Sequence, residues 1–208
     1  DSVYLPHSVD ENIFKKLPEG IAKNFRDDRM PSAKGKVMFF WNNRNARRKQ
    51  SGTLIFWFKE FLDKVGHDKA MLLMHTDPKD PNGQDLNVIL KELNLTDGQV
   101  MFSTQKMPMQ DVAMLYNMAD CTVNIADAEG FGLGTLESLS CGTPIIVNMT
   151  GGLQEQVTDG ENWFGIGIEP ASKAIIGSQT VPYIYEDRVS KEDFINALTK
   201  MYEMTEGE

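Results

Sequence analysis

Two glutamates that bracket a run of glycines are the side chains best suited to chemistry in this sequence. Glu129 and Glu137 have seven residues between them, and that interval contains three glycines. Glycine lets a ligand approach the backbone closely. A helix that begins directly after such a loop presents free N–H groups and the positive end of its dipole, which favour an anion such as phosphate. The segment therefore predicts an anion-binding loop flanked by carboxylates that can hold the hydroxyl groups of a sugar or a diol.

The elements that must position this loop are visible in the apolar pattern. Residues 121–126 predict a strand before the loop, and residues 135–140 predict a helix after it. We expect further strands at 36–41, 70–75, 99–102 and 144–148. We expect further helices at 52–65, 85–93, 109–119 and 191–204. Because the strands are apolar on both faces and alternate with helices, the sequence predicts an α/β fold with a doubly wound parallel sheet.

Composition excludes several classes of protein. The 208 residues are 41% hydrophobic, which is enough for a core. The net charge of −9 argues against a nucleic-acid partner, and no apolar run approaches the ~20 residues of a membrane span. The first residues lack the pattern of a signal peptide. Cys121 and Cys141 are more typical of buried thiols than of a disulfide, which favours a cytoplasmic protein.

The glycine segment resembles a known family. The spacing of Glu129 and Glu137, the GFGL sequence between them and the CGTP sequence at 141–144 are similar to retaining glycosyltransferases of the GT-B fold, in particular family 4, or group 1. These enzymes have two facing Rossmann-like domains. The resemblance implies that Glu129 contacts the transferred sugar and that Glu137 contacts the ribose hydroxyls. It also implies that the donor is bound by the loop of Gly130, Phe131, Gly132 and Leu133.

Basic residues follow the first expected strand, where a dinucleotide-binding protein would have a glycine fingerprint. The turn at 42–44 is Asn-Asn-Arg, so no GxGxxG grip on pyrophosphate is expected there. In the family that the sequence resembles, an arginine and a lysine about five residues later clamp the donor diphosphate. Arg44 and Lys49 have this spacing. Arginine offers a planar fork to phosphate oxygens, and lysine offers a point charge.

The same turn leaves an alternative open. Asn43 and Gln50 stand where the family usually has glycine, and the basic run is also compatible with a solvated helix start. We expect Arg47 and Arg48 to be solvated rather than functional.

The nucleobase would lie over a different loop. Residues 100–120 resemble the strand, loop and helix that receive the base in this family. Base contacts are expected from Ser103, Thr104 and Gln105, and the alternative is an ordinary helix entry with no ligand.

No metal site and no separate cofactor are predicted. His75 and Asp77 lack a third ligand at a useful spacing. The run 80–83 resembles part of a calcium loop, but Pro78 occupies the place of its first carboxylate. The substrate itself would be the nucleotide-diphospho-sugar.

Both ends of the sequence bear on domain organisation. Residues 1–20, with Phe14 and Pro18, resemble the linker strand that opens the second domain of these enzymes. All of residues 1–208 then map onto the C-terminal, donor-binding half of a GT-B fold. An acceptor glycan, or another hydroxyl, would be bound by an N-terminal domain that is absent from this sequence. Residues 170–188 form an irregular insertion, for which a hairpin and an edge cover are alternatives.

The sequence thus predicts the donor-binding domain of a retaining, metal-independent glycosyltransferase for a hexose-type sugar. Arg44, Lys49 and the loop amides would stabilise the charge that grows on the leaving diphosphate. Alone, this domain is expected to bind nucleotide without transferring sugar. Two alternatives remain: a nucleotide-sugar epimerase, which needs no acceptor, and a non-catalytic module that only binds sugar nucleotides.

Overall fold

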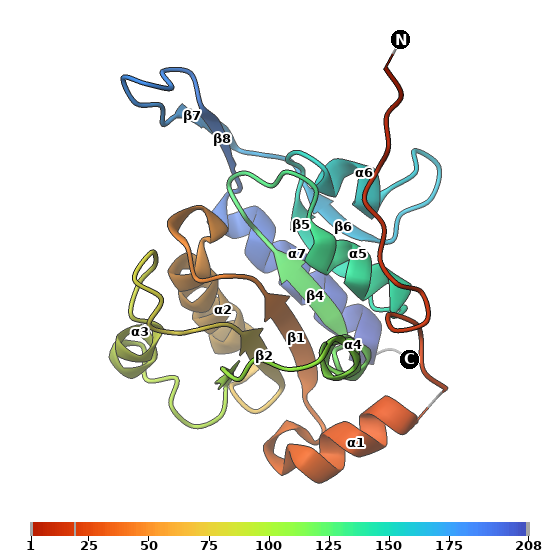
Figure 1. The fold of residues 1–208 in the computed structure, drawn as a ribbon. Coiled ribbons are helices and arrows are strands. Elements are labelled where there is room, and N and C mark those ends of the chain that lie inside the picture. Colours follow the sequence, from red (N-terminus) through yellow and green to blue (C-terminus); the bar gives the residue numbers. More distant parts are fainter. Residues whose placement is uncertain (1, 19, 207–208) are drawn as a thin grey trace.

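A six-stranded parallel sheet forms the centre of the protein in the computed structural model, which describes residues 2–18 and 20–206 (Figure 1). The strand order is β3-β2-β1-β4-β5-β6, and every neighbouring pair is parallel. The strands are β1 (Val37–Asn42), β2 (Ala70–His75), β3 (Val100–Ser103), β4 (Cys121–Asn124), β5 (Ile145–Asn148) and β6 (Gly165–Ile168). This order confirms the predicted doubly wound, Rossmann-like α/β fold.

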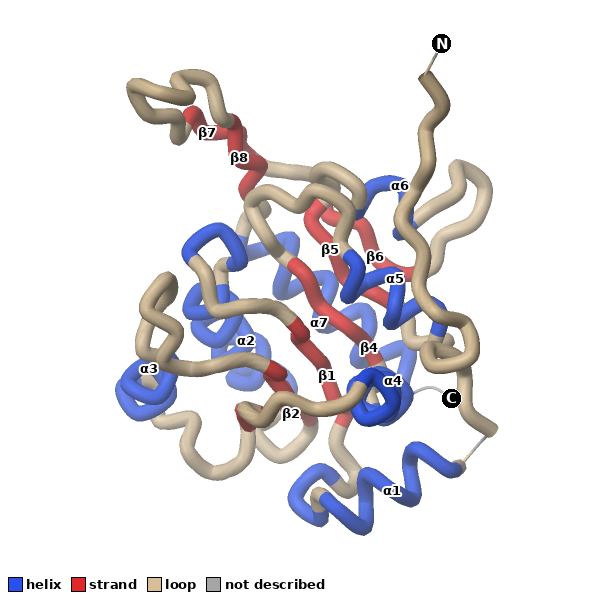
Figure 2. The backbone as a smooth tube through the Cα atoms, viewed as in Figure 1, coloured by secondary structure: helices blue, strands red, loops and turns tan. Residues whose placement is uncertain are grey.

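Helices cover both faces of the sheet (Figure 2). One face carries α1 (Ile21–Arg29), α4 (Met109–Met118), α5 (Leu133–Ser140) and α6 (Leu153–Val157). The other face carries α2 (Ser51–Val65), α3 (Leu86–Glu92) and α7 (Lys191–Glu206). Short 3₁₀ turns, η1 (Pro31–Ala33) and η2 (Arg47–Lys49), lie on either side of β1 in the chain. Among the described residues, no helix is both long enough and apolar enough to cross a bilayer.

The central strand β1 shows why the strands are apolar throughout. Phe39 points to one face, where its ring lies 5.8 Å from that of Phe58 and 5.7 Å from that of Phe61, both on α2. Phe40 points to the other face, where its ring lies 5.1 Å from that of Tyr116 on α4. Since both faces are buried, successive side chains are all apolar, as in other parallel sheets.

Among the α-helices and the strands of the six-stranded sheet, α1, α6 and β6 were not expected from the sequence. The sequence of β6 is Gly-Ile-Gly-Ile, and glycine has a low strand propensity, so the pattern does not predict a strand. A Cβ atom on Gly165 would lie 1.9 Å from the carbonyl oxygen of Ile145 on β5. Glycine is therefore what allows β6 to approach β5.

The N-terminal segment does not form the expected linker strand. Residues 2–18 are extended chain with one turn at 11–14, and Asp1 and Glu19 of the expected linker lie outside the described residues. Pro6 and Pro18 lack the N–H group that a strand requires. The segment instead runs past α6 and α5 along the surface (Figure 1).

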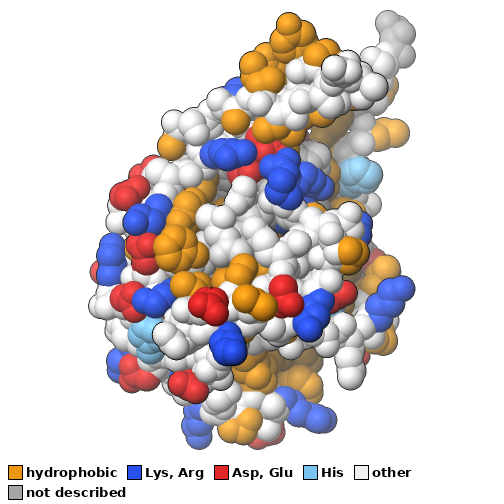
Figure 3. Space-filling view, turned by 90° about the vertical axis from the view of Figure 1, so that its left-hand side faces the viewer, with side chains coloured by type: hydrophobic (Ala, Val, Ile, Leu, Met, Phe, Trp, Pro, Cys, Tyr) orange, Lys and Arg blue, Asp and Glu red, His pale blue; other side chains and the backbone are white. Residues whose placement is uncertain are grey.

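The insertion is a hairpin, one of the two expected alternatives. Strand β7 (Ser172–Ile175) pairs antiparallel with β8 (Tyr185–Arg188), and the hairpin projects away from the sheet (Figure 1). Exposed apolar side chains, including Ile175, Val181 and Tyr183, form a patch on it. Figure 3 shows apolar atoms gathered at this end of the molecule.

Two glycines of β6 provide a matched test of the close strand pairing. We expect Gly165→Ala to lower the free energy of unfolding by about 3 kcal/mol, because its Cβ would meet the backbone of β5. Gly167→Ala should cost about 1 kcal/mol, because the nearest atom, 2.5 Å away, is the Sδ of Met149 at the end of a flexible side chain. Urea unfolding of both variants measures the difference. Equal costs would contradict this account.

Candidate functional site

The candidate site lies where the strand order reverses. Strands β1 and β4 are neighbours in the sheet, and the chain leaves them toward opposite edges. In parallel α/β sheets, a crevice opens at the carboxyl ends of such a strand pair. Here the structure has a cavity of about 340 Å³. Its lining comes from the N-terminal segment and from the regions around the ends of β1 and β4: His7, Asn43, Lys49, Asn124, Glu129 and 131–134.

A larger cavity, of about 710 Å³, lies at the opposite edge of the sheet beside α7. Asp120, Pro144 and Gly165, which lie at the amino ends of their strands, are part of its lining. Its exposed surface is mainly apolar. We place the functional site in the smaller cavity, because paired charges and a helix N-terminus converge there.

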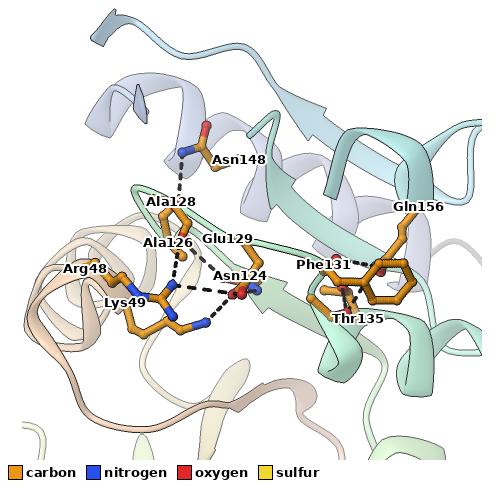
Figure 4. A network of polar contacts seen from close by, with 11 residues as sticks. Arg48, Lys49, Asn124, Ala126, Ala128, Glu129, Phe131, Thr135, Asn148 and Gln156 are labelled. Carbon is orange, nitrogen blue, oxygen red and sulfur yellow. Dashed lines mark hydrogen bonds and ion pairs between the residues drawn. The ribbon is translucent and has the colours of Figure 1, made fainter. Parts of the chain in front are cut away.

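An ion pair between Lys49 and Glu129 forms the centre of the site (Figure 4). Lys49 ends the η2 turn after β1, and its Nζ donates to Oε2 of Glu129 in the loop after β4. The two side chains are only 10% and 11% exposed. Burial lowers the pKa of Lys49, and the hydrogen bond to Glu129 opposes that shift. Two of the residues expected at the site are therefore brought together.

Arg48 extends this cluster. Its guanidinium donates to the carbonyl oxygen of Ala128 and lies 3.9 Å from Oε1 of Glu129. Arg47 forms two hydrogen bonds with Glu186 of β8, at 2.6 and 3.0 Å. Arg47 and Arg48 are exposed, as expected, with 59% and 45% of their side chains accessible, but each also pairs with a carboxylate of the folded chain. Their partners come from segments distant in the sequence, which the local pattern does not reveal.

The glycine loop is fixed by a buried amide. Gln156 of α6 donates from Nε2 to the carbonyl oxygen of Phe131 at 2.6 Å. The Oγ1 atom of Thr135 lies 2.7 Å from the carbonyl oxygen of Gly132 and 2.5 Å from Oε1 of Gln156 (Figure 4). Gly132 has a φ of 86°, a left-handed conformation that favours glycine. These contacts hold the loop directly before α5.

Helix α5 begins at this loop, two residues earlier than expected. Leu133 and Gly134 form its first turn and also line the cavity. The N–H groups of a first helical turn have no partner within the helix, so this end attracts anions. The predicted strand, glycine loop and helix are thus present in the expected order.

Glu137 lies further along α5 in a separate polar cluster. It accepts a hydrogen bond of 2.8 Å from the hydroxyl of Tyr116, which accepts one of the same length from Nδ2 of Asn42. Burial raises the pKa of Glu137. Burial and the nearby Glu137 both raise the pKa of Tyr116. Sequence reasoning missed Asn42 and Tyr116, although the position of Asn42 at the end of β1 was a usable signal.

Arg44 pairs with Asp80 and is not part of the cavity lining. Its Nε lies 2.6 Å from Oδ2 of Asp80, and its side chain is 64% exposed. The hydrogen bonds from Arg44 hold the pKa of Asp80 well below its usual range. The two members of the expected diphosphate clamp therefore have different partners in this structure: Asp80 for Arg44 and Glu129 for Lys49.

The residues expected to receive a nucleobase lie at the same edge of the sheet but outside the cavity lining. Ser103 ends β3, and its Oγ lies 3.0 Å from Nδ1 of His75. Burial lowers the pKa of His75. Thr104 and Gln105 follow on the surface and are exposed.

Two further expectations concern cysteines and metals. Cys121 and Cys141 are free and buried, as predicted, and burial raises the pKa of Cys141 to about 11. Over residues 2–18 and 20–206, the structure contains no group of three or more His, Cys, Asp or Glu side chains arranged to hold a metal ion.

Comparison with known families decides where the chain belongs. The family described as "Glycosyl transferases group 1" matches residues 27–201. The chain is a member of this family. The match contains the ion pair, the glycine loop and both glutamates.

Individual relatives align with only part of this chain. A D-inositol 3-phosphate glycosyltransferase of Acidothermus cellulolyticus is 36% identical over 90 residues, which is 43% of this chain and 20% of the relative. An N-acetyl-alpha-D-glucosaminyl L-malate synthase of Bacillus anthracis is 25% identical over 120 residues, which is 58% of this chain and 30% of the relative. The chain therefore aligns with well under half of these proteins.

Solved structures share the fold. The C-terminal domain of the group 1 glycosyl transferase LpcC from Francisella tularensis has a TM-score of 0.61 at 19% identity, covering 94% of this chain and 91% of that one. The Anabaena protein Alr3699/HepE, solved with UDP-glucose, has a TM-score of 0.68 at 17% identity, covering 95% of this chain and 47% of that one. Both comparisons agree with the predicted Rossmann-like fold.

The raised pKa of Glu137 gives a pH-dependent prediction. The protonated carboxyl is favoured by the folded state, so its contribution to stability is complete below the ordinary glutamate pKa of about 4.3 and is lost as the pH rises through the folded value. Glu137→Gln does not titrate. We therefore expect the variant to gain stability relative to wild type between pH 4 and pH 8. Unfolding in urea at both pH values measures this, and a difference that is constant with pH would contradict it.

Proposed function

We propose that this chain is the donor-binding part of a retaining, metal-independent glycosyltransferase that moves a hexose-type sugar from a nucleoside-diphosphate sugar to an acceptor hydroxyl. One observation carries the proposal: the buried Lys49–Glu129 pair lies beside the N-terminus of α5 in the crevice between β1 and β4. The group 1 family membership and the related fold of a protein solved with UDP-glucose support it.

The diphosphate would lie between Lys49 and the first amides of α5. Departure of the nucleoside diphosphate places negative charge on its phosphate oxygens, and donors already aimed at that charge lower the barrier. Lys49 is buried, so its charge is poorly screened by water. Arg44 would reach the phosphates only by leaving Asp80.

Phosphate and Glu129 would compete for the same ammonium group. In the structure, Glu129 accepts from Lys49, and Nδ2 of Asn124 lies 3.5 Å from the same carboxylate oxygen. A phosphate oxygen that takes over Lys49 would free Glu129 to accept from the hydroxyls of the transferred sugar. Glu137, beside Tyr116, would accept from the ribose diol.

The acceptor would be bound by a further domain facing the crevice, because the chain corresponds to about half of the Anabaena protein. Closure of that domain over the crevice would exclude water and align the reactants. The free, buried thiols suit the cytoplasmic location that we propose.

Two other functions make different predictions. A nucleotide-sugar epimerase would convert its substrate with no acceptor present. A non-catalytic module would bind the nucleotide-sugar and would fail to transfer it even when joined to an acceptor domain. Product analysis with and without acceptor separates the three.

The first binding experiment tests the proposal directly. We expect UDP, GDP or ADP to bind in EDTA, measured by calorimetry, and Lys49→Met to weaken that binding about tenfold to a hundredfold, as for a lost charge-assisted contact of roughly 1.5–3 kcal/mol. Arg44→Ala should weaken it less, because Arg44 is engaged by Asp80. Lys59→Met removes a half-buried charge of α2, which pairs with Asp63 outside the cavity lining, and serves as the control. A strict need for Mg²⁺, or unchanged affinity in Lys49→Met, would refute the proposed phosphate site.

The second experiment separates the two glutamates. Glu137→Gln should weaken the bare nucleotide and the nucleotide-sugar alike, because the ribose is common to both. Glu129→Gln should weaken only the sugar-bearing ligand, because its proposed partner is the transferred sugar. Calorimetry with both ligands on both variants decides. Equal losses for both ligands in both variants would show that the assigned roles are not separate.

A further inference from the structure

The segment that carries Lys49 is not stabilised by its own sequence. It is a 3₁₀ turn of three residues, followed by Gln50 with a φ of 57°. Among the described residues, Gln50 and Asn94 are the only ones other than glycine that have a positive φ. Short 3₁₀ turns have poor hydrogen-bond geometry, and left-handed backbone is unfavourable for residues other than glycine. Such a conformation persists only when its surroundings impose it.

Strand β8 of the hairpin supplies the first of these external contacts. Glu186 is only 2% exposed, and its two carboxylate oxygens accept from the two terminal nitrogens of Arg47 at 2.6 and 3.0 Å. Arg188 donates to the same carboxylate at 3.3 Å. Arg47 lowers the pKa of Glu186, so the group is ionised at neutral pH. A buried carboxylate needs such partners, and the forked geometry of arginine fixes direction as well as distance.

Asp127 supplies the second contact. Its side chain accepts from Nε2 of Gln50 at 2.5 Å, and its N–H donates to the carbonyl oxygen of Arg48 at 2.8 Å. The N–H of Asp187 on β8 donates to the carbonyl oxygen of Asp127, also at 2.8 Å. Both residues that flank Lys49 are thus tied to the loop that carries Glu129.

The hairpin base is in turn fixed to the loop after β5. Nδ2 of Asn148 donates to the carbonyl oxygens of Asp187 and Ala126, at 2.7 and 2.9 Å. The hydroxyl of Thr150 donates to Oδ2 of Asp187 at 2.8 Å. Strand β8 therefore joins the loops that follow β1, β4 and β5. In Figure 3, Lys and Arg side chains gather just below the apolar hairpin patch.

We propose that β8 holds Lys49 in its working position, and that Glu186 and Arg47 are positioning residues for the donor site. Neither residue lines the cavity, so both act through the backbone of η2. The expectation that Glu186 and Arg47 affect donor affinity rests on the function proposed above. The expectation that they hold Lys49 in place does not. The hairpin is then part of the site, although it contributes no group to the ligand.

The test uses Glu186→Gln, which removes the charge at nearly constant size, Arg47→Met, and the double variant. Lys173→Met is the matched control, because Lys173 is exposed and forms an ion pair of 3.4 Å with Asp187 on the same hairpin. Acetylation of Lys49, followed by mass spectrometry without nucleotide, reports how well Lys49 is held. We expect the acetylation of Lys49, relative to that of Lys36, to rise about tenfold in Glu186→Gln and in Arg47→Met, because local loss of structure exposes the Lys49 amine. In the control, the acetylation of Lys49 should stay at the wild-type level.

UDP affinity provides the second measurement. We expect each single variant to weaken binding about threefold to tenfold, and the double variant to be no weaker than either, because both changes break one link. If Arg47 instead contacts phosphate directly, Arg47→Met alone will weaken binding, and Glu186→Gln will not.

The outcomes keep the two proposals apart. Wild-type labelling of Lys49 in both single variants would overturn the positioning role, whatever the nucleotide data show. Failure of the wild-type protein to bind any nucleotide would overturn the proposed function and leave the labelling result valid. If Glu186→Gln does not fold, Arg47→Met still tests the link, because Arg188 remains as a partner for the buried carboxylate.

Discussion

The arrangement of this protein depends on one buried ion pair, between Lys49 and Glu129. The residues are 80 positions apart in the chain, and each follows one of the two central strands. Burying two charges is costly, and attraction in a poorly screened site offsets that cost only when the geometry is good. Three features bring these two side chains together: the parallel pairing of β1 with β4, the η2 turn that carries Lys49, and the loop that carries Glu129. Replacing Glu129 would remove the counter-charge of the buried Lys49, whereas replacing Lys49 would leave Glu129 with Arg48 at 3.9 Å.

The glycine loop solves a related problem with the backbone. A glycine loop between a strand and a helix cannot satisfy all its carbonyl groups through regular structure. Here the carbonyl of Phe131 accepts from Gln156, and Thr135 lies against the carbonyl of Gly132. Buried polar groups of this kind are tolerated because they are paired. These contacts hold the loop in place, and a loop already held in this way would lower the cost of binding the proposed ligand.

Much of the sheet could be predicted because its signals are local. The apolar runs that form β1 to β5 can be recognised without knowing which elements pack beside them. The bounds of β2 match the predicted ones. The missed strand β6 contains glycines, and the reason for them is visible only in the folded protein. A Cβ atom on Gly165 would lie 1.9 Å from the carbonyl oxygen of Ile145 on β5. Lys49 and Glu129 could be found from motif spacing. The pairing of Arg47 with Glu186 could not, because these two residues meet only in the folded chain.

The charged groups of the site share a property that follows from this construction. Burial lowers the pKa of Lys49 and raises that of Glu137, so the fold disfavours the charged form of each. A diphosphate near Lys49 would oppose this lowering, because an opposite charge favours the ammonium form. Hydroxyl donors on Glu137 would favour its carboxylate in the same way. A ligand that carries both a diphosphate and a diol would therefore favour the charged forms of Lys49 and Glu137 together. This is a physical reason for such a ligand to be preferred over an anion or a sugar alone.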